Sequence, residues 1–340
     1  SGIHDVLMLE EEVMRSVKER ALDTAHYFDP HALSHCLWLL AQHRPRATAS
    51  SSAHAISHAG ADTRDGLDWE YDDDRAEAWE VGQEGWEEDE MNVDVGAKQT
   101  REEALKDALV AQAAQLLKGN KFVSSHDVAM TLHAIVKMDL GFNDDHMLQP
   151  AESVLLDLLY KRATLVASDF TPQEVSSVLW SQATLYRRAR MVPMTSFSSF
   201  LVRQVLHEKE HFGAFEMANI MWAAARLDLD LEPEVLAALH ARCVEVAGDM
   251  TSQGVTNLLW ALSQLSTPPP PLLCEALTTR ALLLLRAPGG AGDVFSARGV
   301  ARSLAAIGVL QMDADGAREL AASFLRHYLG MSHELGRGVG

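Results

Sequence analysis

The stretch Asn257-Leu258-Leu259-Trp260-Ala261 recurs in altered form along the chain, and its spacing decides the fold. The other copies are Asn219-Ile220-Met221-Trp222-Ala223, Ser177-Val178-Leu179-Trp180-Ser181 and His35-Cys36-Leu37-Trp38-Leu39. Neighbouring tryptophans lie 42 residues apart between positions 180 and 222, and 38 residues apart between positions 222 and 260. Self-similarity at this period is typical of stacked helical hairpins.

A wider frame surrounds each tryptophan. Ten residues before it stands a bulky apolar residue, the anchor, which is followed by a helix-start signal. In the clearest copy the anchor Phe170 precedes Thr171, Pro172 and Glu174, which form a capping box with proline at the first helical position. The frame can be counted from six anchors: Phe28, Val123, Phe170, Phe212, Met250 and Phe295.

Each copy of the frame predicts two helices. Apolar residues fall at +5, +8, +9, +12 and +15 from the anchor, which is the period of one helix face. A turn, often containing proline, then precedes a second amphipathic stretch, as at residues 233–239 and 272–286. Strand signals are nearly absent. The sequence therefore predicts an all-α, right-handed superhelical solenoid of about six helix-turn-helix repeats, with 38 to 47 residues between successive anchors from position 123 onward.

Charge divides the chain into regions. Residues 51–110 hold 18 acidic and 5 basic residues, so they carry −13 of the net charge of −19. We expect residues 1–46 to form an N-terminal half-repeat and the first repeat, and residues 47–98 to form an acidic, largely disordered insert. Residues 99–330 are then the solenoid, and residues 331–340 a flexible tail. The insert also contains three tryptophans, which could dock on a basic protein surface; a solvated loop is the simpler interpretation.

Several functional classes have little support in the sequence. The chain contains no P-loop, no G-x-S-x-G motif and no glycine-rich phosphate cradle, so neither an enzyme nor a cofactor-binding protein is expected. Its three cysteines form no metal-binding pair, which favours a reducing compartment. No apolar run reaches the length of a membrane span, and we expect neither a membrane nor a small-molecule substrate as partner.

The first helix of each copy carries a polar face. Positions +3, +7 and +14 from the anchor lie together on a helical wheel, opposite the apolar stripe. These eighteen positions, called the polar face below, are His31, His35, Gln42, His126, Met130, Lys137, Gln173, Ser177, Thr184, Phe215, Asn219, Arg226, Gln253, Asn257, Gln264, Arg298, Arg302 and Val309. None is acidic, although the average of 48 acidic residues in 340 predicts about two or three.

All of these except Met130, Thr184 and Val309 are candidate RNA-binding residues. Amides and guanidiniums can hydrogen-bond to base edges, and Phe215 could stack on a base. An ordinary solvated helix face would carry the same residue types, and the wheel alone does not separate the two interpretations. The tryptophans at +10 lie away from the apolar stripe, and packing between repeats is the favoured role for them over base stacking.

The repeated phrase, the proline-rich turn and the second helix resemble the octotricopeptide repeats of green-algal organelle proteins. They are also similar to the helical repeats found with RAP and FASTK-type domains. The resemblance covers residues 28–46 and 121–330, and residues 251–277 match best. It implies an organellar RNA-binding protein whose first helices line the RNA-facing surface. The chain departs from the family in having no recognisable RAP domain after the last repeat and in its variable repeat length.

The repeats are slightly acidic overall, whereas a sequence-specific RNA factor should carry a basic stripe. Our first hypothesis is therefore an RNA-contacting structural component of an organellar ribosome, most simply in the mitochondrion, with the chloroplast as alternative. Its expected partners are single-stranded or ribosomal RNA and neighbouring ribonucleoprotein proteins, the latter in part through the acidic insert. The alternatives are a free organellar factor for transcript stability, translation or splicing, and a helical scaffold that binds only proteins.

Overall fold

The computed structural model describes residues 14–42, 92–119, 121, 124–137, 150–189, 192, 194–286, 293–310 and 314–337. Every regular element within these ranges is a helix, so the predicted all-α class is confirmed. Residues 14–24 form the first described helix, and a 3-10 turn over Ala25–Tyr27 leads from it to the first anchor.

Six helices form a consecutive row, which we call the inner row. Each begins two residues after one of the six anchors, as the frame predicts. They are α2 (Pro30–Gln42), α4 (Ser125–Lys137), α6 (Pro172–Ala189), α9 (Ala214–Arg226), α11 (Ser252–Gln264) and α13 (Ala297–Val309). Each member packs against the member before it and the member after it. Helices far apart in the sequence are thereby brought side by side.

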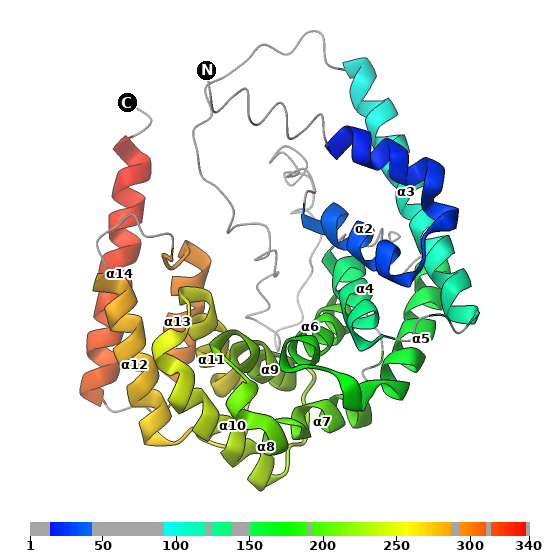
Figure 1. Cartoon of the computed structure of the whole chain (residues 1–340). Coiled ribbons are helices and arrows are strands. Elements are labelled where there is room, and N and C mark those ends of the chain that lie inside the picture. Colours follow the sequence, from blue (N-terminus) through cyan, green and yellow to red (C-terminus); the bar gives the residue numbers. More distant parts are fainter. Residues whose placement is uncertain are drawn as a thin grey trace, which may run out of the picture.

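The intervening helices form a second row, which we call the outer row. They are α3 (Asn92–Lys118), α5 (Pro150–Leu165), α7 (Thr195–Arg203) with the short α8 (Val205–Glu208), α10 (Pro233–Val246), α12 (Pro271–Arg286) and α14 (Ala314–Arg337). Within this row α3 packs on α5, α8 on α10, α10 on α12, and α12 on α14. Figure 1 shows the inner row along the concave side of a curved arrangement and the outer row along its convex side.

The core lies between the two rows and between successive inner helices. The predicted apolar stripe is buried wherever the structure describes it, with a few half-buried members such as Cys36 and Leu304. In α9 all four of its positions, Met217, Ile220, Met221 and Ala224, have no exposed surface. Burying a large apolar side chain contributes about 1.5–3 kcal/mol. This stripe is therefore the main source of stability for the inner row.

Capping explains why each inner helix begins where it does. At four starts the side chain one residue after the anchor accepts a hydrogen bond from the backbone N–H three residues further on. The pairs are Ala32 to Asp29 (2.8 Å), Glu174 to Thr171 (3.4 Å), Gly254 to Thr251 (3.1 Å) and Gly299 to Ser296 (3.0 Å). The Glu174 carboxylate accepts from the Thr171 N–H at 3.0 Å, which confirms the predicted capping box.

The second helix of a copy holds the anchor of the same copy in place. A long polar side chain from the outer row reaches the anchor's backbone carbonyl, which lies in extended backbone outside any helix. The contacts are Gln112 Nε2 to Phe28 O (2.9 Å), Arg242 Nε to Phe212 O (2.8 Å), Arg280 Nε to Met250 O (2.7 Å) and His327 Nε2 to Phe295 O (3.1 Å). These bonds satisfy buried backbone acceptors and fix the two helices of a hairpin relative to each other.

Two of the predicted boundaries fall inside helices. Most of the acidic insert lies outside the described residues, and those residues connect α2 to α3 along the chain. Because α3 already begins at Asn92, the helical region starts a few residues before the expected boundary at 99. At the other end α14 runs to Arg337, past the expected end of the solenoid at 330.

Candidate nucleic-acid interface

The polar face follows the inner row, and its three positions differ in depth. Among the +3 residues Gln253 is half-buried, and the other five, including Phe215 and Arg298, are exposed. The +7 residues become less accessible along the chain, from the exposed His35 to Asn257 and Arg302, each only 8% exposed. At +14, Gln264 is exposed and Lys137 and Arg226 are half-buried, while the side chain of Gln42 lies outside the described residues.

In the N-terminal half of the polar face, histidines pair with carboxylates of the following helix. His31 Nδ1 on α2 lies 3.3 Å from Asp127 Oδ1 on α4. His126 Nδ1 on α4 lies 3.1 Å from Glu174 Oε1 on α6. His35 joins the two, because its ring centroid is 4.3 Å from that of His31 and 6.2 Å from that of His126. Two carboxylates therefore lie beside the histidines of this half, which also contains the cation of Lys137.

These carboxylates stand at +4 from the anchor, a position outside the polar face as the sequence defined it. Asp127 also accepts from Ser34 Oγ of α2 at 3.1 Å, and Glu174 also closes the capping box of α6. Each therefore joins two inner helices. Their position makes the N-terminal half a poor place for a phosphate, because the negative charges would repel it.

The C-terminal half, on α9, α11 and α13, contains no histidine and a single carboxylate. Glycine replaces the acid at +4 in α11 and α13, at Gly254 and Gly299. A Cβ at Gly299 would lie 3.3 Å from Thr256 Oγ1, so glycine also allows close approach of α13 to α11. The three helices together contain three arginines and one glutamate, a balance of 3 − 1 = +2 in a chain of net charge −19.

Glu216, the only acidic residue of those three helices, accepts a hydrogen bond from the Gly213 N–H at 3.0 Å and so caps α9. The side chains of Phe215 and Arg298 are exposed near the starts of α9 and α13. Phe215 is 63% exposed, so its ring is accessible from outside the molecule. An exposed aromatic ring beside a cationic surface is the arrangement on which single-stranded nucleic acids stack.

Trp260 is the centre of this C-terminal half. The guanidinium carbons of Arg226 on α9 and Arg302 on α13 each lie 5.3 Å from the centroid of its ring. The ring of Trp222 on α9 lies 6.4 Å away, and Trp260 itself is half-buried. Guanidiniums at this distance are attracted to the ring face. One side chain of α11 thus holds a guanidinium from each of the two neighbouring helices.

Tryptophans at +10 pack between neighbouring inner helices, as expected. Trp222 contacts Trp260, and Trp180 lies 4.9 Å from the ring of His133 on α4. Burial and the nearby Lys137 lower the pKa of His133 to about 4, so its ring is neutral in this contact. Trp38 on α2 is 38% exposed and packs less completely.

The remaining candidates serve the surface in different ways. Gln253 Nε2 donates to Asn257 Oδ1 at 3.1 Å, which orients both amides on α11. With 8% exposure, Asn257 and Arg302 offer a ligand little surface, so their role in the polar face is to position neighbours. Gln173 is exposed, and Ser177 and Asn219 are half-buried, so these three remain accessible in part.

The sequence analysis did not identify Trp260 as part of the surface, because it assigned the tryptophans to packing between repeats, although the helical wheel places position +10 away from the apolar stripe. The contact with two arginines of other helices becomes visible only once α9, α11 and α13 are side by side. The sequence did contain a signal for this contact. Arg226 stands at +14 in one copy and Arg302 at +7 two copies later, and the copy between them contains Trp260.

Comparisons with known proteins add no identification. No protein-family model matches the chain, and no curated protein matches it at a significant level. Over the described ranges, no group of three or more His, Cys, Asp or Glu converges as metal ligands would. No helix within those ranges has both the length and the apolar content to cross a bilayer.

Proposed function

We propose that the chain is a right-handed superhelical solenoid of about six helix-turn-helix repeats that binds single-stranded RNA along its inner row. The observation that carries this proposal is that Phe215 and Arg298 are exposed on α9 and α13, with the half-buried Arg226 held against the ring of Trp260 on the intervening α11. Guanidiniums bind phosphates, and exposed aromatic rings stack on bases. The octotricopeptide-like sequence pattern supports the same assignment.

The unequal charge of the polar face supports a restricted RNA footprint. The positive surface spans α9, α11 and α13, and the face of α2 and α4 pairs its histidines with carboxylates. A factor that reads one base per repeat would need the whole row to be accessible to RNA. A protein that contacts RNA over part of its surface and proteins elsewhere needs only one such region.

We therefore infer that this is an RNA-contacting structural component of an organellar ribosome, in the mitochondrion. A helical scaffold that binds only proteins is the second candidate, and the histidine–carboxylate pairs beside the N-terminal half of the polar face favour it. The other alternative is a free organellar transcript factor, and sedimentation separates it from a ribosomal component. A ribosomal component should co-sediment with ribosomal particles in an organelle lysate, whereas a free transcript factor should remain in lighter fractions.

RNA binding itself is tested by fluorescence anisotropy with a labelled single-stranded RNA at several salt concentrations. The variant is Arg298→Gln on the inner row, and the matched control is Arg286→Gln, an exposed arginine of α12 that pairs with Glu319 at 2.7 Å. Neutralising one phosphate contributes about 0.7 to the slope of log K against log salt for single strands. We expect Arg298→Gln to reduce the slope by about that amount and Arg286→Gln to leave it unchanged.

Equal effects of the two variants would remove the inner row from the proposal. Absence of salt-dependent binding by the unaltered protein would favour the protein-only scaffold. Melting temperatures should stay close to that of the unaltered protein in both variants, because both arginines lie on the surface.

A further inference from the structure

A pocket lies where α5 and the C-terminal half of α6 meet the start of α7. Its volume is about 220 Å³, and its walls include Tyr160, Gln182, Leu185 and Met194. At about 30 Å³ per water molecule this is space for about seven waters, or for one ring-sized group. It is smaller than the pockets of about 300–1,000 Å³ that hold whole cofactors.

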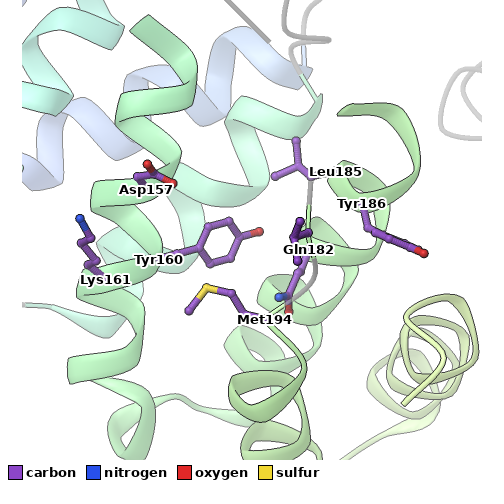
Figure 2. Close-up of a pocket in the computed structure, with 8 residues that line it drawn as sticks. Asp157, Tyr160, Lys161, Gln182, Leu185, Tyr186 and Met194 are labelled. Atoms are coloured by element: carbon purple, nitrogen blue, oxygen red, sulfur yellow. The ribbon is translucent and has the colours of Figure 1, made fainter. Parts of the chain in front are cut away.

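The hydroxyl of Tyr160 is the polar group that sets the chemistry of this pocket. Tyr160 is 4% exposed, and its hydroxyl has no hydrogen-bond partner within the described part of the chain. Figure 2 shows the ring extending from α5 toward Gln182 and Leu185 of α6, with Met194 beside it. A buried polar atom without a partner costs about 1–3 kcal/mol. The hydroxyl is itself buried, so a ligand that displaced the neighbouring side chains would supply its missing partner.

The surroundings restrict what that ligand can be. Leu185 and Met194 provide apolar walls, and the Gln182 amide, held by a hydrogen bond from Ser198 Oγ, adds a second polar group. A tyrosine hydroxyl is protonated at physiological pH, and burial raises the pKa of Tyr160 further, so it can donate a hydrogen bond. An apolar side chain from a partner protein would leave this hydroxyl without a hydrogen bond. A flat group with donors and acceptors on its edge would satisfy it.

We propose that this pocket binds a nucleobase and, on the function proposed above, takes one extruded base of the bound RNA at the end of its path, where α9 packs on α6 and α7. Base edges carry adjacent donors and acceptors that match a hydroxyl and an amide, and the ring faces suit the apolar walls. Lys161, an exposed residue that also lines the pocket, supplies a cation for the phosphate of the same nucleotide. Asp157 lines the same side and disfavours more than one phosphate there.

The test is saturation-transfer NMR with adenosine, guanosine, cytidine and uridine, using the unaltered protein and three variants. Tyr160→Phe removes only the hydroxyl, and we expect about five-fold weaker nucleoside binding, the factor typical of one hydrogen bond. Its melting temperature should be unchanged or higher, because the variant removes a buried group without a partner. A merely structural hydroxyl would instead lower it.

Two further variants complete the design. Met194→Trp should fill the pocket and abolish binding while Tyr160 remains in place. Tyr186→Phe is the control, because Tyr186 also lines the pocket but is 40% exposed, and Figure 2 shows its ring turned away from Tyr160. It should bind nucleosides like the unaltered protein.

The proposal is overturned if no nucleoside binds, or if Tyr160→Phe and Met194→Trp bind as well as the unaltered protein. Fluorescence anisotropy with single-stranded RNA measures RNA binding separately, so that the pocket and the proposed function can fail independently. RNA binding without nucleoside binding rejects the pocket and leaves the inner row as the RNA surface. Nucleoside binding without RNA binding supports the pocket and rejects the wider function.

Discussion

Replacing Trp260 by leucine should destabilise the protein, because Arg226 and Arg302 of the two neighbouring inner helices lose their contacts with the Trp260 ring. The Trp260 ring has guanidiniums of Arg226 and Arg302 at 5.3 Å and the Trp222 ring at 6.4 Å. Leucine retains part of the apolar contact with the core but has no ring face. The substitution therefore removes the two cation–ring contacts and the aromatic pair together.

The size of the effect follows from these three contacts. A cation–ring contact contributes about 1 kcal/mol at a partly exposed site and about 2 when desolvated, and an aromatic pair adds about 1. The three contacts sum to about 4 kcal/mol, with the larger cation–ring share expected from Arg302, which is 8% exposed. We expect the free energy of unfolding, measured by urea denaturation with circular dichroism, to fall by about 4 kcal/mol.

A double-mutant cycle isolates the cation–ring part. Arg302→Met keeps an unbranched side chain and removes the charge, so the coupling between it and Trp260→Leu should be about 1–2 kcal/mol. The matched control pairs Arg302→Met with Trp180→Leu, on α6, three positions away along the inner row; these two should be additive. A Trp260–Arg302 coupling below about 0.3 kcal/mol would refute the assignment of Trp260 as the organising residue.

Three further predictions concern the frame of the fold. Arg280→Met removes the bond to the anchor carbonyl of Met250 and should lower the free energy of unfolding by about 2 kcal/mol, as urea titration would show. His133 titrates near pH 4 when folded and near 6.5 when unfolded, so stability should fall by up to about 1.4 kcal/mol per pH unit as pH decreases from 6.5 to 4. In unfolding measured against pH, His133→Phe should reduce this slope and leave the contributions of other groups, including His240, whose pKa burial also lowers; an unchanged slope would contradict the assignment. Burial raises the pKa of Cys243 to about 12, so mass spectrometry should find it unreacted with iodoacetamide at pH 8 until the protein is unfolded.

Most of the helical frame was predictable because its signals are local. The capping side chains, the proline at the first helical position and the apolar stripe all lie within about fifteen residues of each anchor. For this reason the start of every inner helix, including α4 with its degenerate anchor Val123, could be placed from the sequence. The contacts between outer-row side chains and anchor carbonyls were not predicted, since they join residues about 30 or more positions apart.

The candidate site was predicted less completely, because a helical wheel gives a direction and not a depth. It placed Arg302 and Arg298 on one face but could not show that α11 covers the first and leaves the second exposed. It also treated each helix alone. The carboxylates Asp127 and Glu174 reach the polar face of the preceding helix, across 96 and 48 residues of sequence. The charge division of the polar face therefore depends on packing between helices.

The central claim is that RNA lies on α9, α11 and α13, and ultraviolet crosslinking tests it most directly. The full-length protein would be irradiated with single-stranded RNA, and the crosslinked peptides would be identified by mass spectrometry. We predict crosslinks at the inner row, with Phe215 and the start of α13 foremost. Crosslinks confined to the outer helices α10, α12 and α14, or to the histidine–carboxylate face of α2 and α4, would contradict the account.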